Sequence, residues 1–481
     1  MATLCRRASR VCTFGRKLAL RNQATVTTHE IQLDNTSQFL DTTPYRKHPG
    51  ITSMNMVCLP PPLEDAAKIL LNKCSIKHFE ERSRFLCNFL WSRKRPVEDW
   101  VIQQKAQELE RKAKQRLQNH AKSTDLSGKE NVDKDQPNLP LDELHFEEKI
   151  HRKVLTDLKK AVYHWKPVRY NEELSLIYAA ARLDGGYAAV SRALHEIKKR
   201  VPDFAPQTLL DFGSGTGTVT WAVHSKWGST MKEYVCVDSS AAMNNLSDLL
   251  LRGGCESQEP HIKGVYFRQF LPVSPKVQFD LVVSAFSLIE LPSASDRITT
   301  IQTLWRKTQS FLVLIENGTK EGHQVLMEAR NTILKLQEED ELTKEHWDVS
   351  VFAPCPHALS CPKLVGKVVL PCNFAQSYRR LSLNSNSENK LEKFSFVILQ
   401  RGPADNTSHW PRIVQPVLRR ARHVHCHLCC SNGEKQHVVI TAKKHGRDLY
   451  RCARSSDLGD RLPMAAVKSN SDIDVSAPGI P

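Results

Sequence analysis

The chain has 481 residues, a formal net charge of +16 at pH 7 and a pI near 9.2. Its length is enough for two or three domains with a sizeable core, and its apolar runs fall short of the roughly 18 residues of a membrane-spanning helix, which excludes that class. The excess of Lys and Arg favours a polyanionic partner, although solvated lysines on an ordinary soluble protein give the same charge.

The N-terminal segment is basic and contains no acidic residue before Glu30. Its Arg and Lys residues are interspersed with Ser, Thr and apolar residues, as in amphipathic mitochondrial transit peptides. We predict that residues 1–25 are such a peptide and that the protein lies in the mitochondrial matrix; a disordered basic arm is the alternative. In that reducing compartment we expect the 14 cysteines to be thiols or metal ligands rather than disulfides.

Helical periodicity dominates residues 60–200, for which we predict an α-helical N-terminal domain. Apolar residues recur three and four apart in its first part, and a polar stretch rich in Lys, Glu and Gln follows. The composition of residues 123–140, with Gly and Pro, predicts a mobile linker. The helical segments expected here cover 62–95, 97–122, 141–165, 171–183 and 187–199.

The most informative stretch of the chain runs from Thr208 to Thr218. Its apolar beginning predicts a short buried strand over 208–212, its three glycines predict a tight turn, and a helix is expected from Thr218. Glycine lets a ligand approach the backbone, and amides at the start of a helix can receive a polar or negatively charged group. The pattern Asp-x-Gly-x-Gly-x-Gly, which begins at Asp211, resembles motif I of class I S-adenosylmethionine methyltransferases.

This resemblance implies a site for S-adenosyl-L-methionine, because in that family the cofactor's methionine moiety lies against the glycines. A second strand, expected over 234–238, ends in an acid where such folds place the carboxylate that binds both ribose hydroxyls. An ordinary glycine turn in an α/β sheet is the alternative. The cofactor-binding residues predicted on this basis are Asp211, Gly213, Ser214, Gly215, Gly217 and Asp238.

Strands and helices alternate after the glycine turn. Alternation of elements of this length predicts an α/β fold over residues 201–402, with a mostly parallel, doubly wound Rossmann-type sheet like that of class I methyltransferases. The expected strands cover 208–212, 234–238, 280–284, 311–316 and 393–400, and the expected helices cover 241–252, 296–309 and 324–336.

A cysteine-rich insertion interrupts this alternation at residues 350–375. It holds Cys355 and Cys361, each followed by proline, and then Cys372. Clustered thiolates in a reducing compartment bind soft metals, and four of them suit either zinc or a [4Fe–4S] cluster. The spacing does not choose between the two.

The fourth ligand is expected from the segment 423–430, which contains three more cysteines. We predict Cys429, which would tie the C-terminal segment to the α/β domain. Cys426 and Cys430 remain alternatives, as does a separate zinc site that combines these cysteines with neighbouring histidines. Free packing cysteines are the remaining interpretation.

A small basic, β-rich module is predicted over residues 403–462. Strand-like pieces alternate with turns there, and basic residues greatly outnumber acids, which favours binding of RNA phosphates over a merely solvated surface. After it, residues 463–481 are expected to be a disordered tail. The ten Lys and Arg residues of the module are Arg412, Arg419, Arg420, Arg422, Lys435, Lys443, Lys444, Arg447, Arg451 and Arg454.

Two further motifs, Ile315-Glu-Asn-Gly-Thr319 and His445-Gly-Arg-Asp-Leu-Tyr-Arg451, accompany the glycine turn and the cysteines. With them, residues 60–460 resemble the methyltransferase-like family of mitochondrial small-ribosomal-subunit assembly proteins. The resemblance implies a matrix protein that binds immature small-subunit rRNA, a site for S-adenosyl-L-methionine, and a [4Fe–4S] cluster on Cys355, Cys361, Cys372 and Cys429. We expect no membrane partner and a monomer outside the ribosome.

Residues that would carry methyl transfer are not recognisable, so we predict no catalytic residue. The strand over 280–284 leads into Phe286 and Ser287 without the acidic or amide residue and paired prolines of amine methylation. No thiol is present there for covalent activation of a pyrimidine. Glu316 is a conceivable general base, but a lone carboxylate at a strand end is more often structural. A non-catalytic assembly factor is therefore favoured over an active rRNA methyltransferase, and a metabolic small-molecule methyltransferase has no support.

Overall fold

The structure, a computed structural model, describes residues 31–466 except 126–140, 162, 164, 275, 341–348, 366–368, 382–387 and 404–408. The predicted transit peptide therefore lies outside the described residues, as does most of the predicted linker. Where the tail was expected, Met464–Ala466 instead forms a strand, and the remainder of that segment is outside the description. Among the described helices, none is long and apolar enough to cross a membrane.

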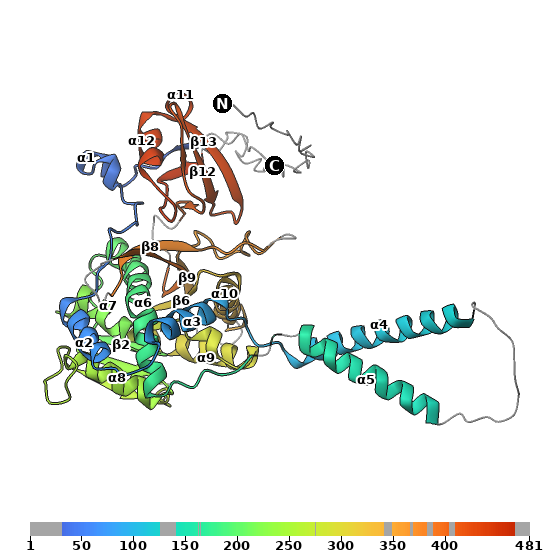
Figure 1. The fold of residues 1–481 in the computed structure, drawn as a ribbon. Coiled ribbons are helices and arrows are strands. Elements are labelled where there is room, and N and C mark those ends of the chain that lie inside the picture. The colour runs from blue at the N-terminus through green and yellow to red at the C-terminus, as the bar shows by residue number, and fades with distance from the viewer. Residues whose placement is uncertain are drawn as a thin grey trace, which may run out of the picture.

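A large mixed sheet forms the centre of the molecule (Figure 1), in the order β4-β3-β2-β5-β6-β9-β7, with β8 also paired to β9. Strands β2 to β6 are parallel, whereas β9 runs antiparallel to both β6 and β7. This confirms the predicted α/β sheet. The strands are β2 Thr208–Phe212, β3 Glu233–Val237, β4 Val265–Arg268, β5 Phe279–Ala285, β6 Thr308–Asn317, β7 Val349–Ala353, β8 Phe374–Arg379 and β9 Asn389–Arg401.

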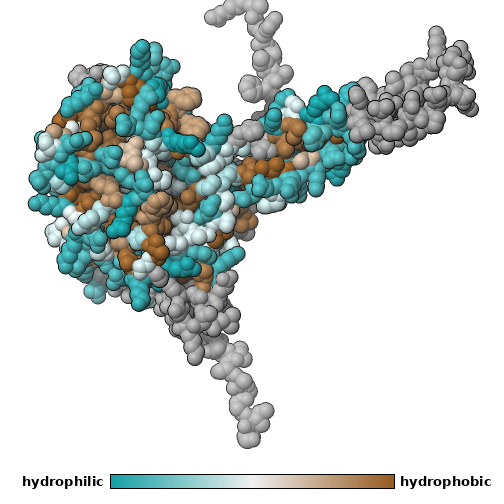
Figure 2. Space-filling model, turned by 90° about the horizontal axis from the view of Figure 1, so that it is seen from below, coloured by the Kyte–Doolittle hydropathy of each residue, from teal (hydrophilic) through white to brown (hydrophobic). Residues whose placement is uncertain are grey.

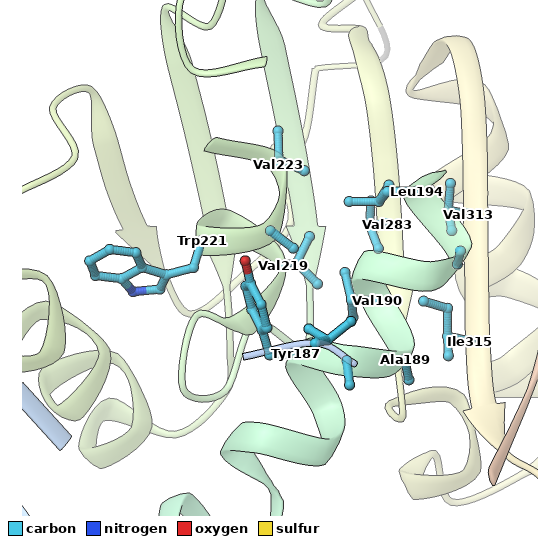
Figure 3. Close-up of a cluster of buried hydrophobic side chains, with 14 of the residues drawn as sticks. Tyr187, Ala189, Val190, Leu194, Val219, Trp221, Val223, Val283, Val313 and Ile315 are labelled. Atoms are coloured by element: carbon cyan, nitrogen blue, oxygen red, sulfur yellow. The ribbon is translucent and has the colours of Figure 1, made fainter. Parts of the chain in front are cut away.

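Helices cover both faces of this sheet, which explains why the central strands are apolar on both sides. One face packs against α2, α6, α7 and α8, and the other packs against α9 and α10. Figure 3 shows side chains of α6 and α7, including Tyr187 and Val219, in the core beside Val283 of β5 and Val313 of β6. The helices are α2 Pro61–Asn72, α3 Phe79–Ser92, α6 Glu172–Arg200, α7 Thr218–Trp227, α8 Ala241–Leu251, α9 Ala294–Arg306 and α10 Lys320–Asp340.

Helix α6 is continuous where two helices were expected. The sequence suggested a break near Gly185 and Gly186, but both glycines lie buried in the middle of the helix. A Cβ atom at Gly185 would lie 2.5 Å from Oε2 of Glu392 on β9. The glycine therefore allows a close approach of helix and sheet rather than ending the helix.

The N-terminal helices do not form one separate domain, contrary to the prediction for residues 60–200. Helices α2 and α6 belong to the core of the sheet. Helices α4 (Asp99–Asp125) and α5 (Leu141–Ala161) instead project as an arm (Figure 1). Ala113, Ile150 and Val154 are buried between them, and Figure 2 shows hydrophobic side chains along this arm between hydrophilic ones.

The C-terminal module is a smaller antiparallel sheet that lies beyond β8 in Figure 1. Its central strand β12 pairs with β13 on one side and with β10 and β11 on the other. Helix α12 packs against the inner face, around Val424, Leu428 and Leu449. The elements are β10 Arg412–Ile413, β11 Leu418–Arg419, β12 His423–Cys429, β13 Lys435–Thr441, α11 Ala442–His445 and α12 Arg447–Ser455.

Residues 31–53 belong to this C-terminal module, which the sequence did not predict. Strand β1 (Ile31–Leu33) pairs with β14, the strand at Met464–Ala466. The Tyr45 hydroxyl donates to Asp448 at 2.7 Å, and the amide of Thr52 donates to the Asp460 carboxylate at 2.7 Å. Local periodicity in the sequence cannot reveal contacts between residues more than 400 positions apart. The hydrogen bonds to these two carboxylates make the arrangement specific.

Candidate cofactor site, cysteine cavity and basic surface

The glycine turn connects β2 to α7 and has the backbone geometry that the sequence suggested. Gly213, Gly215 and Gly217 all have positive φ angles, of 73°, 49° and 74°. The amides of Gly213 and Ser214 donate to the Val237 carbonyl at 2.7 and 3.1 Å, which holds the turn against the end of β3. The turn is thereby fixed before any ligand binds.

The three glycines have different neighbours. A Cβ atom at Gly213 would lie 2.0 Å from Oγ of Ser287, and one at Gly217 would lie 2.5 Å from Oγ of Ser247. At Gly215 the nearest heavy atom would be 3.9 Å away. The outer glycines are therefore needed for internal packing, and only Gly215 leaves its Cα open to a ligand.

We expect Gly213→Ala to destabilise the fold by at least about 2 kcal/mol, because it adds a steric clash to the roughly 1–2 kcal/mol cost of a left-handed alanine. Gly215→Ala should cost about 1 kcal/mol, because its Cβ has room. Thermal unfolding of both variants measures the difference. Equal losses would contradict the distinction between packing and ligand-facing glycines.

Asp238 follows β3 and is fixed beside the turn. Its Oδ2 accepts the amide of Gly215 at 2.9 Å, and its Oδ1 accepts the amide of Ser240 at 2.9 Å. Burial raises the pKa of Asp238, while these two amides oppose the rise. Each carboxylate oxygen can accept a further hydrogen bond, so the geometry suits a ligand with paired hydroxyls.

Several buried polar atoms around the turn have no hydrogen-bond partner in the described part of the chain. Both carboxylate oxygens of Asp211 are in this state, as are the hydroxyls of Ser214 and Ser284. Burial, and then the charge of Asp238, raise the pKa of Asp211 well above its ordinary value. Buried polar atoms without partners are rare in proteins, so this set fits a site that a polar ligand completes.

Two tyrosines from outside the sheet cover this region, and neither was recognised as a site residue from the sequence. The rings of Tyr170 and Tyr178 pack edge to face, with centroids 5.4 Å apart. A Cβ atom at Gly215 would lie 4.0 Å from the Tyr178 ring. Burial raises the pKa of Tyr178 to about 12. These aromatic rings form an apolar wall on the open side of the glycine turn.

The strand ends beside this site hold two buried polar side chains that bond to the protein itself, although Oε2 of Glu316 has no hydrogen-bond partner among the described residues. Asn317 accepts from Arg182 at 3.2 Å and donates to the Leu90 carbonyl at 3.3 Å. Oε1 of Glu316 accepts the amide of Ile289 at 3.2 Å, and burial raises the pKa of Glu316 to about 8. With this pKa, most of the carboxyl is protonated at neutral pH and cannot accept a proton in that form.

Phe286, the aromatic residue expected after the fourth parallel strand, has a positive φ angle of 59°. The guanidinium of Arg182 lies over its ring, with the guanidinium carbon 4.7 Å from the ring centroid. Arg182 in turn pairs with Glu392 at 2.8 Å. The structure therefore fixes this strained residue by contacts with the protein itself.

The four predicted metal ligands line one small cavity. Cys355 and Cys361 come from the insertion, Cys372 from the segment before β8, and Cys429 from the end of β12 in the C-terminal module. The three thiols of Cys355, Cys361 and Cys429 are each 8% exposed. Cys355 and Cys429 are 74 positions apart in the chain, and the structure brings them to the same cavity.

These thiols influence one another electrostatically. Burial raises the pKa of Cys355 to about 12 and also raises that of Cys372, with the neighbouring thiols adding to the rise. In the described residues, no group of three or more His, Cys, Asp or Glu side chains is arranged so that it could hold a metal ion. The donor set fits a soft metal.

Two buried histidines contact the thiols, and the sequence analysis missed both. Nε2 of His357 lies 3.4 Å from Sγ of Cys429, and Nε2 of His323 on α10 lies 3.6 Å from Sγ of Cys361. Burial lowers the pKa of His323 to about 4, so its ring is neutral. Only His357, two residues after Cys355, had a sequence signal.

The alternative fourth ligands are placed differently. Cys426 is fully buried on the opposite face of β12, in the hydrophobic core of the module, because side chains alternate along a strand. Cys430 packs beside that same core. Neither lines the cavity.

Nine of the ten basic residues predicted for the surface of the C-terminal module are exposed, and Arg412 is the exception. Arg412 is only 2% exposed and pairs with Glu196 of α6 at 2.7 Å, so it joins the module to the sheet. Its Nε also donates to the Pro354 carbonyl at 2.9 Å, beside the cysteine cavity. The nine exposed basic residues are Arg419, Arg420, Arg422, Lys435, Lys443, Lys444, Arg447, Arg451 and Arg454.

The strand order and the glycine turn define the class of protein. An antiparallel strand inserted between the last two parallel strands, together with a glycine-rich turn after the first parallel strand, is the arrangement of methyltransferase-like Rossmann folds. The described cofactor-site geometry agrees with this class.

Comparison with known proteins gives the family. The family described as "Mitochondrial small ribosomal subunit Rsm22" matches residues 172–463. The human protein "Ribosome assembly protein METTL17, mitochondrial" is 53% identical over 433 residues, which cover 90% of this chain and 89% of that protein. The Saccharomyces cerevisiae protein "Ribosome assembly protein RSM22, mitochondrial" is 21% identical and covers 67% and 73%. The chain belongs to the Rsm22 family of mitochondrial ribosome assembly proteins.

Solved methyltransferase structures are more distant. The magnesium protoporphyrin IX methyltransferase of Synechocystis PCC 6803 has a TM-score of 0.29 and 11% identity, and covers 54% of this chain and 99% of its own. The N-methyltransferase NodS of Bradyrhizobium japonicum has a TM-score of 0.26 and 12% identity, and covers 44% and 86%. At these scores the comparison adds nothing to the topology described above.

Proposed function

We propose that this protein is an assembly factor of the mitochondrial small ribosomal subunit that acts in the matrix by binding small-subunit rRNA. The observation that carries the proposal is 53% identity, over nine-tenths of the chain, to a human mitochondrial ribosome assembly protein. The exposed basic residues of the C-terminal module supply the chemistry for binding a polyanion.

Binding of small-subunit rRNA tests this proposal. Because phosphate contacts release counterions, affinity should fall steeply with salt, and each lost contact should reduce the log–log slope by roughly 0.7 to 0.9. Arg420→Gln with Arg422→Gln is expected to weaken binding and flatten the slope, since both residues are exposed on the module. Filter binding at several salt concentrations measures it.

Glu80→Gln with Glu81→Gln, two exposed acids on α3 that the proposal places outside the RNA surface, is the matched control. Its slope should equal that of the unchanged protein. Failure of the unchanged protein to bind rRNA or sediment with precursor subunits would contradict the assembly role itself.

The cofactor site is proposed to bind S-adenosyl-L-methionine without methyl transfer. The residues proposed to hold it are Asp211, Gly213, Ser214, Gly215, Gly217 and Asp238, and what supports this is the open Cα of Gly215 and the two amide-bound oxygens of Asp238. The bound cofactor would offer an activated methyl group. The buried, neutral carboxyl of Glu316 and the structural bonds of Asn317 argue against a base beside it.

Methylation assays distinguish the alternative, an active rRNA methyltransferase. Protein incubated with labelled S-adenosyl-L-methionine and immature small-subunit rRNA should bind the cofactor without transferring label to the rRNA. Incorporation that Glu316→Gln removes, with cofactor affinity unchanged, would establish an enzyme instead.

The four thiols of Cys355, Cys361, Cys372 and Cys429 are proposed to hold a [4Fe–4S] cluster. A single zinc ion would draw four sulfurs to within about 3.8 Å of one another, given Zn–S bonds of about 2.3 Å. Four thiols that line one cavity suit either group, and the resemblance of the chain to its family favours the cluster.

A further inference from the structure

A row of histidines lies on the outer face of the β12–β13 hairpin. His423, His425 and His427 alternate along β12 with residues that are fully buried against α12. His437 of β13 is directly opposite His427 in the antiparallel register. Because side chains alternate between the faces of a strand, the four imidazoles share one half-exposed face.

The rings in this row are stacked. His427 and His437 have centroids 4.4 Å apart and an interplanar angle of 13°, and His437 and His425 are 5.2 Å apart at 19°. Nδ1 of His425 lies 3.0 Å from Nε2 of His437, which is a hydrogen-bonding distance. His437 is therefore the centre of three near-parallel rings: it stacks on His427 and meets the edge of His425, and these contacts fix its orientation.

The surroundings of the stack are apolar and basic. Leu418 of β11 lies opposite His425 of β12 and is 47% exposed. Val439 of β13 is 40% exposed. Arg420 and Lys435 are exposed at the two ends of the face. Burial, then the rings of His437 and His423 and the charge of Arg420, lower the pKa of His425. The rings thus form an aromatic surface with cations at its borders.

We propose that this face, the histidine stack of His425, His427 and His437, binds unpaired bases of RNA by stacking. The inference rests on the proposed rRNA binding and adds to it the form of RNA that is recognised. Aromatic rings on an exposed sheet face, bordered by Lys and Arg, are the arrangement with which proteins bind single-stranded RNA. A double helix hides its base faces, so the partner is a single-stranded segment.

The site separates the two components of binding. The exposed arginines contact phosphates in either single or double strands, whereas a stacking platform contributes only where a base face is free. Loss of one stacking ring typically weakens binding by about fivefold or more. The salt dependence should stay unchanged when a ring is removed, because no phosphate contact is lost.

The test compares His437→Ala with His437→Phe in the full-length protein. The probes are a single-stranded RNA oligonucleotide and a duplex of the same sequence, with affinity measured at several salt concentrations. His437→Ala should weaken single-strand binding by about fivefold or more with an unchanged salt slope, and leave duplex binding as it was. His437→Phe should restore affinity, because phenylalanine keeps the ring face and removes the nitrogens.

His78→Ala, a change of an exposed histidine before α3, is the matched control and should bind normally. Equal single-strand affinity of His437→Ala and the unchanged protein would overturn the stacking inference while leaving rRNA binding intact. Failure of His437→Phe to restore affinity would show that ring nitrogens, as in metal ligation, are what matters. No binding by the unchanged protein would instead refute the proposed function.

Discussion

Anaerobically purified full-length protein is expected to be brown and to bleach on reduction, and Cys429→Ser is expected to remove the colour, the iron and the sulfide together. Cys429 lies at the end of β12 in the C-terminal module, whereas the other three thiols lie in the part of the sequence that forms the large sheet. The cluster would therefore join two parts of the molecule. Its loss should lower the unfolding temperature by at least about 5 °C, or roughly 2 kcal/mol for a domain of this size.

Cys426→Ser is the matched control for this experiment. It changes the same residue type in the same strand, but on the face that packs in the hydrophobic core of the module. It should keep its iron and colour even though a buried hydroxyl costs some stability. Colourless protein with one zinc per chain and no sulfide would contradict the iron–sulfur proposal and leave the link between the two domains intact.

The ion pair beside the cavity explains why cluster loss need not separate the domains entirely. Arg412 of the module donates to Glu196 of α6, and Arg192 also pairs with that carboxylate, at 3.1 Å. All three side chains are buried. A buried charged network is costly to disrupt by removing one partner, so it continues to fix the position of the module.

The sequence predicted five of the eight strands of the large sheet, namely β2, β3, β5, β6 and β9, but not β4, β7 and β8. The run over 208–212 and the glycines after it define the first strand and turn without help from distant residues. Local pattern failed at α6, where Gly185 and Gly186 looked like a break but serve a close contact with Glu392. A close approach between elements distant in sequence leaves no local signal.

The residues of the candidate sites also divide into those that a local sequence pattern reveals and those that it does not. Motif residues such as Gly215 and Cys355 could be found from the sequence because their chemistry depends on spacing in the chain. Tyr178 and His323 could not, because they reach the sites from α6 and α10, where apolar periodicity gives only a helix. Arg412 was misassigned to the basic surface because charge alone does not reveal a buried partner.

Between pH 5 and about 8, Glu316 is expected to make the free energy of unfolding fall as pH rises, and Glu316→Gln is expected to remove that contribution. Burial raises the pKa of Glu316 from its ordinary 4.5 to about 8 in the folded protein. Between these values the folded state holds a proton that the unfolded state has lost, so stability decreases with pH. The stabilisation is complete below the unfolded pKa and is lost as pH approaches the folded one.

Glu290 adds a smaller change of the same sign, because burial raises its pKa to about 7 against the opposing charge of Arg93. At about 1.4 kcal/mol for each pKa unit, the Glu316 shift from 4.5 to about 8 corresponds to roughly 5 kcal/mol. Chemical denaturation at pH 5, 7 and 9 measures it.

Glutamine has the shape of glutamic acid and can still accept the Ile289 amide, so the variant should fold. Glu64→Gln, at an exposed pair on α2, should keep the slope of the unchanged protein. An unchanged slope in Glu316→Gln would mean that Glu316 is ionised at neutral pH, which would restore it as a candidate base for methyl transfer.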